Sequence, residues 1–334
     1  MDARQACQCV RFKDAGSRAS GKLIAKRVAK LSESHPVSVQ HYENFPVASL
    51  LCPPALRPAV TAIYHFARTA DDLADEGSAS PENRLADLAQ YRRDLHATAR
   101  STPPSPRWQA QFAALGAQLQ RHALPLPLLH ALLDAFEQDV RNPDYADRAA
   151  LLNYCSHSAN PVGRLLLHLY GIDDRLSLQR SDAICSALQL INFWQDLSVD
   201  GPRGRHYVPL TDLQAHAVSA AELAAATDSP RARNLVRSLC DWAEALMLQG
   251  APLATRVAGR SGWELRLVVQ GGLRILEKLR RMDHAALLQR PRLTAVDVPV
   301  LLWRAIRMNG MNGMSGKCSK GSKGSKGSKG NVQR

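Results

Sequence analysis

Two acidic segments constrain this chain more than any other feature of its sequence. Asp71, Asp72 and Asp75 close one otherwise apolar segment, and Asp196 and Asp200 stand in a second. Each segment holds an Asp pair spaced i,i+4, which places both carboxylates on one helix face. Like charges on a buried helix face repel each other and are costly to desolvate. We therefore expect a cation between the segments, and Mg2+, which takes carboxylate and phosphate oxygens, indicates a metal-bridged diphosphate site.

The spacing of apolar residues predicts an all-α protein. Leu- and Ala-rich stretches repeat with helical periodicity and are interrupted at proline and glycine. No run alternates apolar and polar residues as strands do, and no glycine-rich nucleotide fingerprint follows a strand. We expect one folded domain at 36–308. Its expected helices are 54–76, 82–100, 107–122, 126–141, 147–170, 175–200, 230–258, 262–289 and 294–308.

The net charge of +13 is concentrated at the two ends of the chain. Residues 1–35 carry +5 and residues 312–334 carry +6, so the remainder is nearly neutral. A neutral body with basic ends favours contact with an anionic membrane surface over binding of nucleic acid. The alternative is basic ends without any partner. We expect a flexible extension at 1–35 and a disordered Gly/Ser/Lys-rich tail at 309–334.

Cysteine usage indicates a reducing compartment, and hydropathy indicates a chain without a membrane-spanning helix. The seven cysteines are scattered and show no zinc-ligand spacing. No apolar run reaches the roughly 18 residues that a membrane-spanning helix needs, and no secretory signal is visible. We expect a cytoplasmic protein, at most peripheral on the inner face of the cell membrane, without an obligate protein partner.

The first acidic segment carries a tyrosine and an arginine on the same face as its carboxylates. Tyr64, Arg68, Asp72 and Asp75 follow at steps of four, four and three residues. The planar guanidinium of Arg68 matches phosphate oxygens, so this face suits a diphosphate. The alternative is a solvated face with an Arg68–Asp72 ion pair, which explains three carboxylates at the end of an apolar run less well.

The second acidic segment carries a stripe of amides and carboxylates. Gln189, Asn192, Asp196 and Asp200 follow at steps of three, four and four residues among apolar neighbours. A buried polar stripe needs partners, and metal, water and phosphate would all serve. A stripe exposed to solvent on one side explains the same spacing equally well.

Two further segments would complete such a site. Arg205 and Tyr207 follow the second acidic segment and would close over a diphosphate as a lid, although basic surface loops are common. Between 153 and 163, small residues precede Pro161, which should kink a helix and open space for a ligand. Tight packing between helices is the alternative for this second segment.

Together these segments resemble the squalene/phytoene synthases, which join or rearrange prenyl chains head to head. Finer features resemble the bacterial hydroxysqualene synthase branch of that family. Two departures from the wider family fit that branch: residues 42–44 replace a Ser-rich stretch, and Gly271-Gly272 replaces a tyrosine. The resemblance spans about 38–290, with its strongest blocks at 62–76, 154–163, 189–200 and 205–209 and its branch features at 41–49, 192–196 and 270–277.

The resemblance implies an isoprenoid-synthase-type helical bundle with a central cavity. It implies presqualene diphosphate as substrate, Mg2+ as cofactor, and capture of a rearranged carbocation by water to give hydroxysqualene. The implied residues fall into three groups: Asp71, Asp72, Asp75, Asn192, Asp196 and Asp200 on the metal side; Arg68, Arg205 and Tyr207 at the leaving group; and Tyr64, Phe66 and Tyr154 along the cavity, with Tyr42, Asn160 and Gln189 as candidates for positioning the water.

Three alternatives stay open at this point. The first alternative is an enzyme that condenses two prenyl diphosphates to presqualene diphosphate or phytoene, as other members of the family do. A reductive squalene synthase would use a nicotinamide cofactor, for which the sequence shows no fingerprint. A non-catalytic assembly protein with the same fold is the third, and the two complete acidic segments argue against it.

Overall fold

The computed structural model describes residues 51–205 and 207–311, and this part of the chain consists of helices and loops without a strand. The predicted all-α class is confirmed. Tyr42, the predicted extension at 1–35 and the tail beyond Met311 lie outside the described residues. The α-helices are α2 (Arg57–Asp75), α3 (Pro81–Ala99), α4 (Gln109–His122), α5 (Leu126–Arg141), α6 (Arg148–Ser158), α7 (Asn160–Leu169), α8 (Arg175–Gln195), α9 (Leu197–Asp200), α10 (Leu210–Ala215), α11 (Ala220–Ala224), α12 (Pro230–Gly250), α13 (Leu253–Arg256), α14 (Gly259–Arg281) and α15 (Val298–Met311), with short 3-10 helices η1 (Pro106–Trp108), η2 (Gly201–Arg203) and η3 (Ala295–Asp297).

Side-chain caps set the starts of several long helices. Ser80, Asp147, Asp174 and Ser229 each accept a hydrogen bond from a backbone N–H in the first turn of α3, α6, α8 and α12. Such caps satisfy N–H groups that have no partner within the helix. These helices therefore begin within a residue of the predicted positions.

The structure divides or shortens four of the predicted helices. The stretch 230–258 becomes α12 and α13, with a break at Ala251 and Pro252. The stretch 147–170 is broken at Ala159, and Pro161 stands in the first turn of α7, which accounts for the predicted kink. The stretch 175–200 is interrupted at Asp196, and α14 ends well before 289 because Asp283 and His284 adopt left-handed backbone conformations. The short helices α10 and α11 were not predicted, since five or six residues show no clear periodicity.

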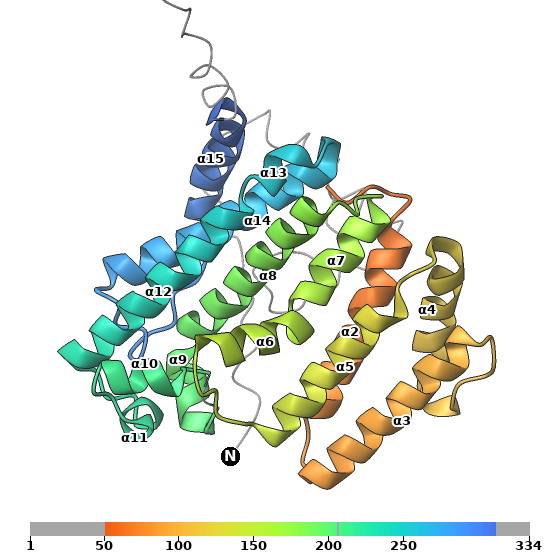
Figure 1. Ribbon diagram of the computed structural model, residues 1–334, viewed down its shortest axis with the longest axis horizontal. Helices are drawn as coiled ribbons and strands as arrows, with labels where there is room; N and C mark the ends of the chain where they lie inside the picture. Colours follow the sequence, from red (N-terminus) through yellow and green to blue (C-terminus); the bar gives the residue numbers. More distant parts are fainter. Residues whose placement is uncertain (1–50, 206, 312–334) are drawn as a thin grey trace, which may run out of the picture. The chain divides into compact units, whose positions relative to one another are not determined.

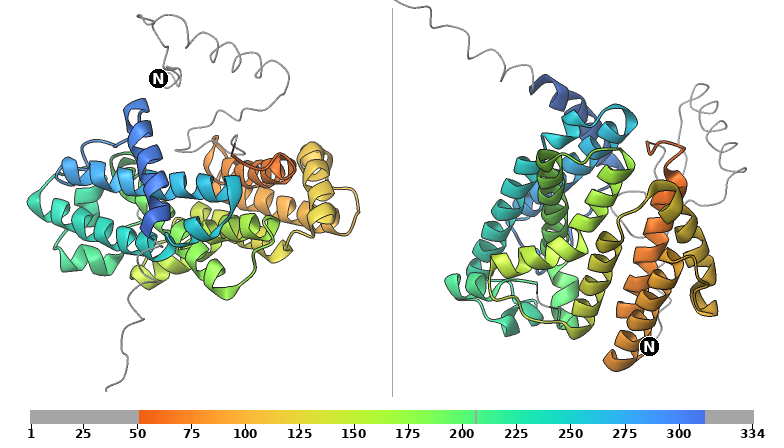
Figure 2. Two further views of the ribbon diagram at one scale, coloured as in Figure 1. Left: turned by 90° about the horizontal axis from the view of Figure 1, so that it is seen from above. Right: turned by 45° about the vertical axis from the view of Figure 1, so that its right-hand side comes forward.

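Two hydrophobic clusters hold the helices together. One surrounds α8, α12 and α14, where Leu190 and Trp194 are fully buried. The other lies among α2, α3, α4 and α5, where Phe66, Tyr91 and Phe112 pack on one another. Helices α5 and α7 connect the two clusters, because α5 contacts α2 and α7, and α7 contacts α8 (Figures 1 and 2).

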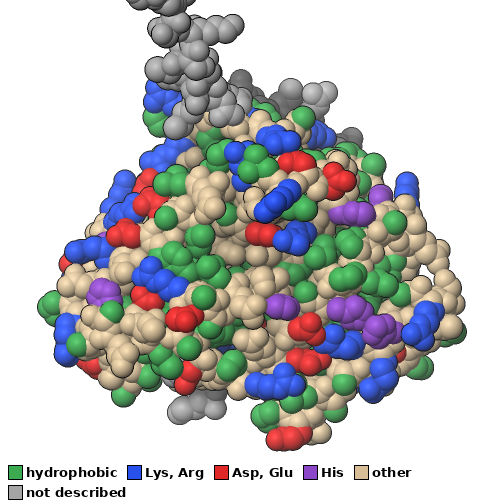
Figure 3. Space-filling view, in the orientation of Figure 1, with side chains coloured by type: hydrophobic (Ala, Val, Ile, Leu, Met, Phe, Trp, Pro, Cys, Tyr) green, Lys and Arg blue, Asp and Glu red, His purple; other side chains and the backbone are tan. Residues whose placement is uncertain are grey.

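This packing positions the two acidic segments. Helices α2 and α8 run in the same direction, so their C-terminal ends lie at the same end of the bundle (Figure 1). Both acidic segments occupy those ends. Among the described helices, none combines the length and the apolar character that a membrane crossing requires. On the face shown in Figure 3, basic and acidic side chains are interspersed, without a single continuous basic field.

Candidate active site

The acidic end of α2 is organised around Arg68. Its guanidinium contacts the carboxylates of Asp71, Asp72 and Glu76 at 2.7, 2.6 and 2.7 Å. The Arg68–Asp72 ion pair, which the sequence suggested as an alternative to a diphosphate site, is therefore present. It belongs to a cluster of three carboxylates around one arginine. Burial, followed by the charge of nearby Asp75, raises the pKa of Asp71 to about 6, and Arg68 only partly opposes this shift. The cluster thus carries more negative charge than Arg68 compensates.

Arg205 joins the two acidic segments. It lies in the loop after η2 and contacts Asp75 of α2 at 2.7 Å. Burial raises the pKa of Asp200 above its usual value, while Arg205 and Arg203 oppose this and the charge of Asp75 adds to it. Asp75 and Asp200 therefore lie close enough to repel each other, and the charge of Arg205 attracts both. The structure brings together the ends that the sequence predicted to face a shared ligand.

Asp196 has an arginine partner that sequence reasoning missed. Asp196 ends α8, and Arg290, from the chain after α14, donates from Nη2 to Asp196 Oδ2 at 3.0 Å and pairs with Oδ1 through Nε. Burial raises the pKa of Asp196 to about 6, with Arg290 opposing and Asp200 adding to the shift. The only sequence signal was a pair of arginines around Pro291.

A further carboxylate, on a third helix, was also missed. Asp139 lies near the end of α5 and accepts a hydrogen bond from the Tyr154 hydroxyl at 3.1 Å. Burial raises its pKa to about 7; the bond from Tyr154 lowers it, and the charges of Asp75 and Asp71 raise it further. Asp139 therefore belongs to the same electrostatic site. Its sequence signal was weak: no basic residue stands three or four positions away to pair with it.

Aromatic side chains pack beside these carboxylates. The Tyr207 ring stacks on Phe193 with centroids 3.7 Å apart, and Tyr154 lies 6.1 Å from both rings. Phe193, Asp200, Arg205 and Tyr207 line a pocket whose enclosed space of about 10 Å³ holds about one water molecule. That space is far smaller than a prenyl chain, so the predicted central cavity stays a prediction.

The other predicted residues take varied positions. On α8, Gln189 is half-buried and Asn192 is exposed. Buried Asn160 accepts a hydrogen bond from the Ser186 hydroxyl at 2.9 Å. Tyr64 shares a face of α2 with Arg68 and lies near its guanidinium.

Phe66 and Gly272 lie in packed interiors. Phe66, only 1% exposed, packs against Tyr91 and Phe112 in the cluster of α2, α3 and α4, so the structure does not bring it to the carboxylates. A Cβ on Gly272 would lie 2.8 Å from Met247 Cε and 3.2 Å from Ile191 Cδ1. Gly272 therefore permits a close approach of α14 to α8 and α12.

The carboxylates fit Mg2+ by their chemistry, although they are not gathered into a ligand set. Among residues 51–205 and 207–311, no three His, Cys, Asp or Glu side chains converge on one metal position. The carboxylates instead contact Arg68, Arg205 and Arg290. Burial is the largest cause of the raised pKa values of Asp71 and Asp196, and a neighbouring carboxylate adds to each shift. A hard divalent cation would stabilise the ionised form of both groups. An anionic ligand would in turn suit the arginines.

This chain is similar in sequence and in fold to known proteins. The family model for squalene/phytoene synthase matches residues 38–297 of this chain. The chain belongs to the squalene/phytoene synthase family. Hydroxysqualene synthase of Zymomonas mobilis is 39% identical over 184 residues, covering 54% of this chain and 59% of that protein's length. Hydroxysqualene synthase of Sinorhizobium fredii is 32% identical over 243 residues, covering 72% of this chain and 80% of that protein.

A solved structure and a relative of another activity complete the comparison. The crystal structure of a squalene synthase from Alicyclobacillus acidocaldarius matches with a TM-score of 0.68 and 34% identity, covering 74% of this chain and 91% of that chain. Presqualene diphosphate synthase of Zymomonas mobilis is 31% identical over 209 residues, covering 62% of this chain and 70% of that protein. Relatives with three different named activities therefore resemble this squalene/phytoene synthase family member: hydroxysqualene synthase, squalene synthase and presqualene diphosphate synthase.

Proposed function

We propose that this chain ionises presqualene diphosphate in a Mg2+-dependent reaction and that water captures the rearranged cation, giving hydroxysqualene and diphosphate. The observation that carries the proposal is the Arg205–Asp75 contact at 2.7 Å, because Arg205 directly follows the second acidic segment and pairs with the first. A site with excess carboxylate and interleaved arginine suits a metal–diphosphate unit. The similarity to hydroxysqualene synthases supports the choice of branch.

The first step is departure of the diphosphate. The bond between the substrate carbon and the diphosphate oxygen breaks, and its electron pair leaves with the diphosphate. Mg2+ would supply Lewis-acid stabilisation of the negative charge that develops on the leaving group. Arg68 and Arg205 would donate hydrogen bonds to the same oxygens. The candidates for holding the metal are Asp71, Asp72, Asp75, Asn192, Asp196 and Asp200.

The second step is control of the carbocation. Tyr154, Tyr207 and Phe193 form an aromatic group beside the carboxylates, and the faces of aromatic rings stabilise a nearby cation. Packing that excludes solvent delays capture until the cyclopropyl cation has rearranged. Water then adds through its oxygen and releases one proton. Asp139 is well placed to receive that proton through its contact with Tyr154, because its pKa lies near 7.

Condensation of two prenyl diphosphates is the second candidate, favoured by the similarity to presqualene diphosphate synthases. Purified protein with Mg2+ would be incubated with presqualene diphosphate, with farnesyl diphosphate alone, and with presqualene diphosphate plus a reduced nicotinamide cofactor. We expect hydroxysqualene from the first incubation, no consumption of substrate in the second, and no squalene in the third, by mass spectrometry of extracted lipids. Consumption of farnesyl diphosphate alone would refute the proposal, and squalene in the third would assign a reductive enzyme.

A paired variant tests whether the chain is an enzyme at all. The Asp72→Asn/Asp196→Asn protein should keep its helical circular-dichroism spectrum and lose product formation. Asp87→Asn is the matched control, since Asp87 pairs with Arg107 on an exposed surface. Unchanged biological activity of the paired variant would favour a non-catalytic assembly role.

A further inference from the structure

Helix α15 presents an apolar stripe to solvent. Val298, Leu302 and Ile306 follow at steps of four residues and are 50, 45 and 58% exposed. Trp303, beside this row, is 55% exposed, and Val296 in η3 is 78% exposed. Residues four apart lie on one helix face, so these side chains form a continuous surface. This set, Val296, Val298, Leu302, Trp303 and Ile306, is called the α15 stripe below.

The α15 stripe is not the face by which the helix packs on the protein. Leu301 and Ala305, at 8 and 0% exposed, turn inward, and α15 packs on α14. The helix is therefore apolar on two sides, whereas a surface helix is ordinarily polar on its outer face. Isolated exposed apolar residues need no explanation, but a contiguous group of this kind marks an interaction surface.

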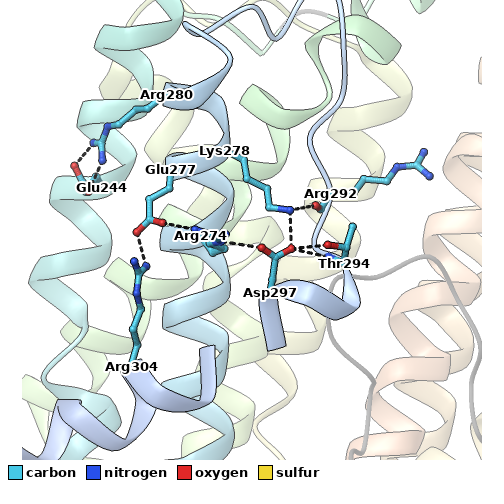
Figure 4. Close-up of polar contacts among 9 residues, drawn as sticks. All are labelled: Glu244, Arg274, Glu277, Lys278, Arg280, Arg292, Thr294, Asp297 and Arg304. Carbon is cyan, nitrogen blue, oxygen red and sulfur yellow. Dashed lines mark hydrogen bonds and ion pairs between the residues drawn. The ribbon is translucent and has the colours of Figure 1, made fainter. Parts of the chain in front are cut away.

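A buried ion-pair network fixes the orientation of α15 (Figure 4). Asp297, 1% exposed, accepts hydrogen bonds from Arg274 Nε at 2.8 Å and Lys278 Nζ at 2.6 Å, both from α14. About two turns further along, Arg304 pairs with Glu277, which also binds Arg274. These contacts hold the start and the middle of α15 against α14. The outward direction of the stripe is consequently a fixed property of the fold.

The charges around the stripe identify an anionic partner. From Val298 to the end of the chain the sequence contains no Asp or Glu, and the 23 residues from 312 to 334 add a net +6. Arg307 is exposed and lies over the Trp303 ring, with its guanidinium carbon 4.5 Å from the centroid. A tryptophan beside an arginine, on an apolar stripe followed by a lysine-rich chain, is the combination that suits the boundary between acyl chains and anionic headgroups.

We infer that α15 docks this protein on an anionic lipid bilayer, with the α15 stripe at the acyl boundary and Arg307 at the headgroups. This surface lies on α15 and is separate from the carboxylates and arginines of the candidate active site. Docking therefore does not depend on which prenyl substrate the protein uses.

Vesicle co-sedimentation of the full chain tests the inference. Vesicles of phosphatidylcholine alone are compared with vesicles that also contain phosphatidylglycerol. The wild-type protein should bind the anionic vesicles and bind the neutral ones less tightly. Leu302→Gln/Ile306→Gln should bind the anionic vesicles about tenfold less tightly or weaker still, as expected for two half-exposed aliphatic side chains. Leu248→Gln on α12 is the matched control, because Leu248 is 55% exposed and should leave binding unchanged.

Three outcomes would overturn the inference. The first is a wild-type protein that does not bind anionic vesicles. The second is a double variant that binds them as tightly as wild type, because binding would then depend on the charge of the basic tail and not on the α15 stripe. In the third, sedimentation velocity would show a wild-type dimer that the double variant converts to monomer, so that a second copy covers the stripe. Circular dichroism and thermal unfolding of the double variant should match wild type, because both substituted side chains are exposed.

Discussion

Replacing Asp139 by asparagine should stabilise this protein at neutral and alkaline pH. Asp139 is partly buried between α5 and α6, where its carboxylate accepts a bond from Tyr154 and faces the charges of Asp71 and Asp75. Asparagine keeps an acceptor oxygen for the Tyr154 hydroxyl and removes the charge. The substitution therefore tests the cost of burying one ionised carboxylate, to which the charges of nearby carboxylates add.

The magnitude follows from the pKa of Asp139, which is about 7 against its usual 3.8. Because the folded pKa is raised, the folded protein retains a proton that the unfolded chain has already released. The stabilisation from this group is complete below about pH 4 and is lost as the pH rises to about 7. Three pKa units correspond to about 4 kcal/mol, and solvent contact of the site reduces the expected difference to about 2 kcal/mol.

Urea unfolding across this pH range provides the assay, in buffer without added Mg2+. The free energies of unfolding of wild type and Asp139→Asn should agree near pH 4, and the variant should be more stable by about 2 kcal/mol near pH 8. Asp87→Asn, which breaks an exposed pair with Arg107, should show no such growth with pH. A variant that is less stable than wild type at pH 8, or a difference that does not depend on pH, would refute the reasoning.

Three further substitutions test other parts of the structure. Asp72→Asn should lower Mg2+-dependent diphosphate release about 100-fold with an unchanged circular-dichroism spectrum; wild-type rates would remove Asp72 from the site. Gly250→Ala should lower the free energy of unfolding by about 1–3 kcal/mol, because its Cβ would lie 2.6 Å from the backbone oxygen of Arg180; unchanged urea unfolding would contradict that close packing. Asp297→Asn should cost about 3 kcal/mol, since Lys278 and Arg274 lose a buried partner; a cost below about 1 kcal/mol would show that the network does not hold α15.

Local spacing was enough to predict the helices and the composition of each acidic face. Arg68 and Asp72 lie one turn apart, and helical geometry alone places them in contact at 2.6 Å. The same argument separates Tyr64 from Phe66, which stand two positions apart. The first lies with Arg68, whereas the second is buried in the cluster with Tyr91.

Contacts between distant parts of the chain could not be predicted in this way. Arg290 reaches Asp196 from 94 positions away, and Asp139 reaches Tyr154 across two helices. Each contact depends on how α5, α8 and the chain after α14 pack, which no local pattern in the sequence specifies. A lone aspartate near the end of a helix carries little signal until its neighbours in space are known.

The pairing of Arg205 with Asp75, and of Arg68 with Asp71 and Asp72, has a consequence for ligand selection. A magnesium ion alone must displace an arginine to reach these carboxylates, and a free phosphate alone must displace a carboxylate to reach these arginines. A ligand that brings both charges together exchanges one set of ion pairs for another and leaves no group without a partner. Metal and diphosphate should accordingly promote each other's binding reciprocally, and either one alone should bind weakly.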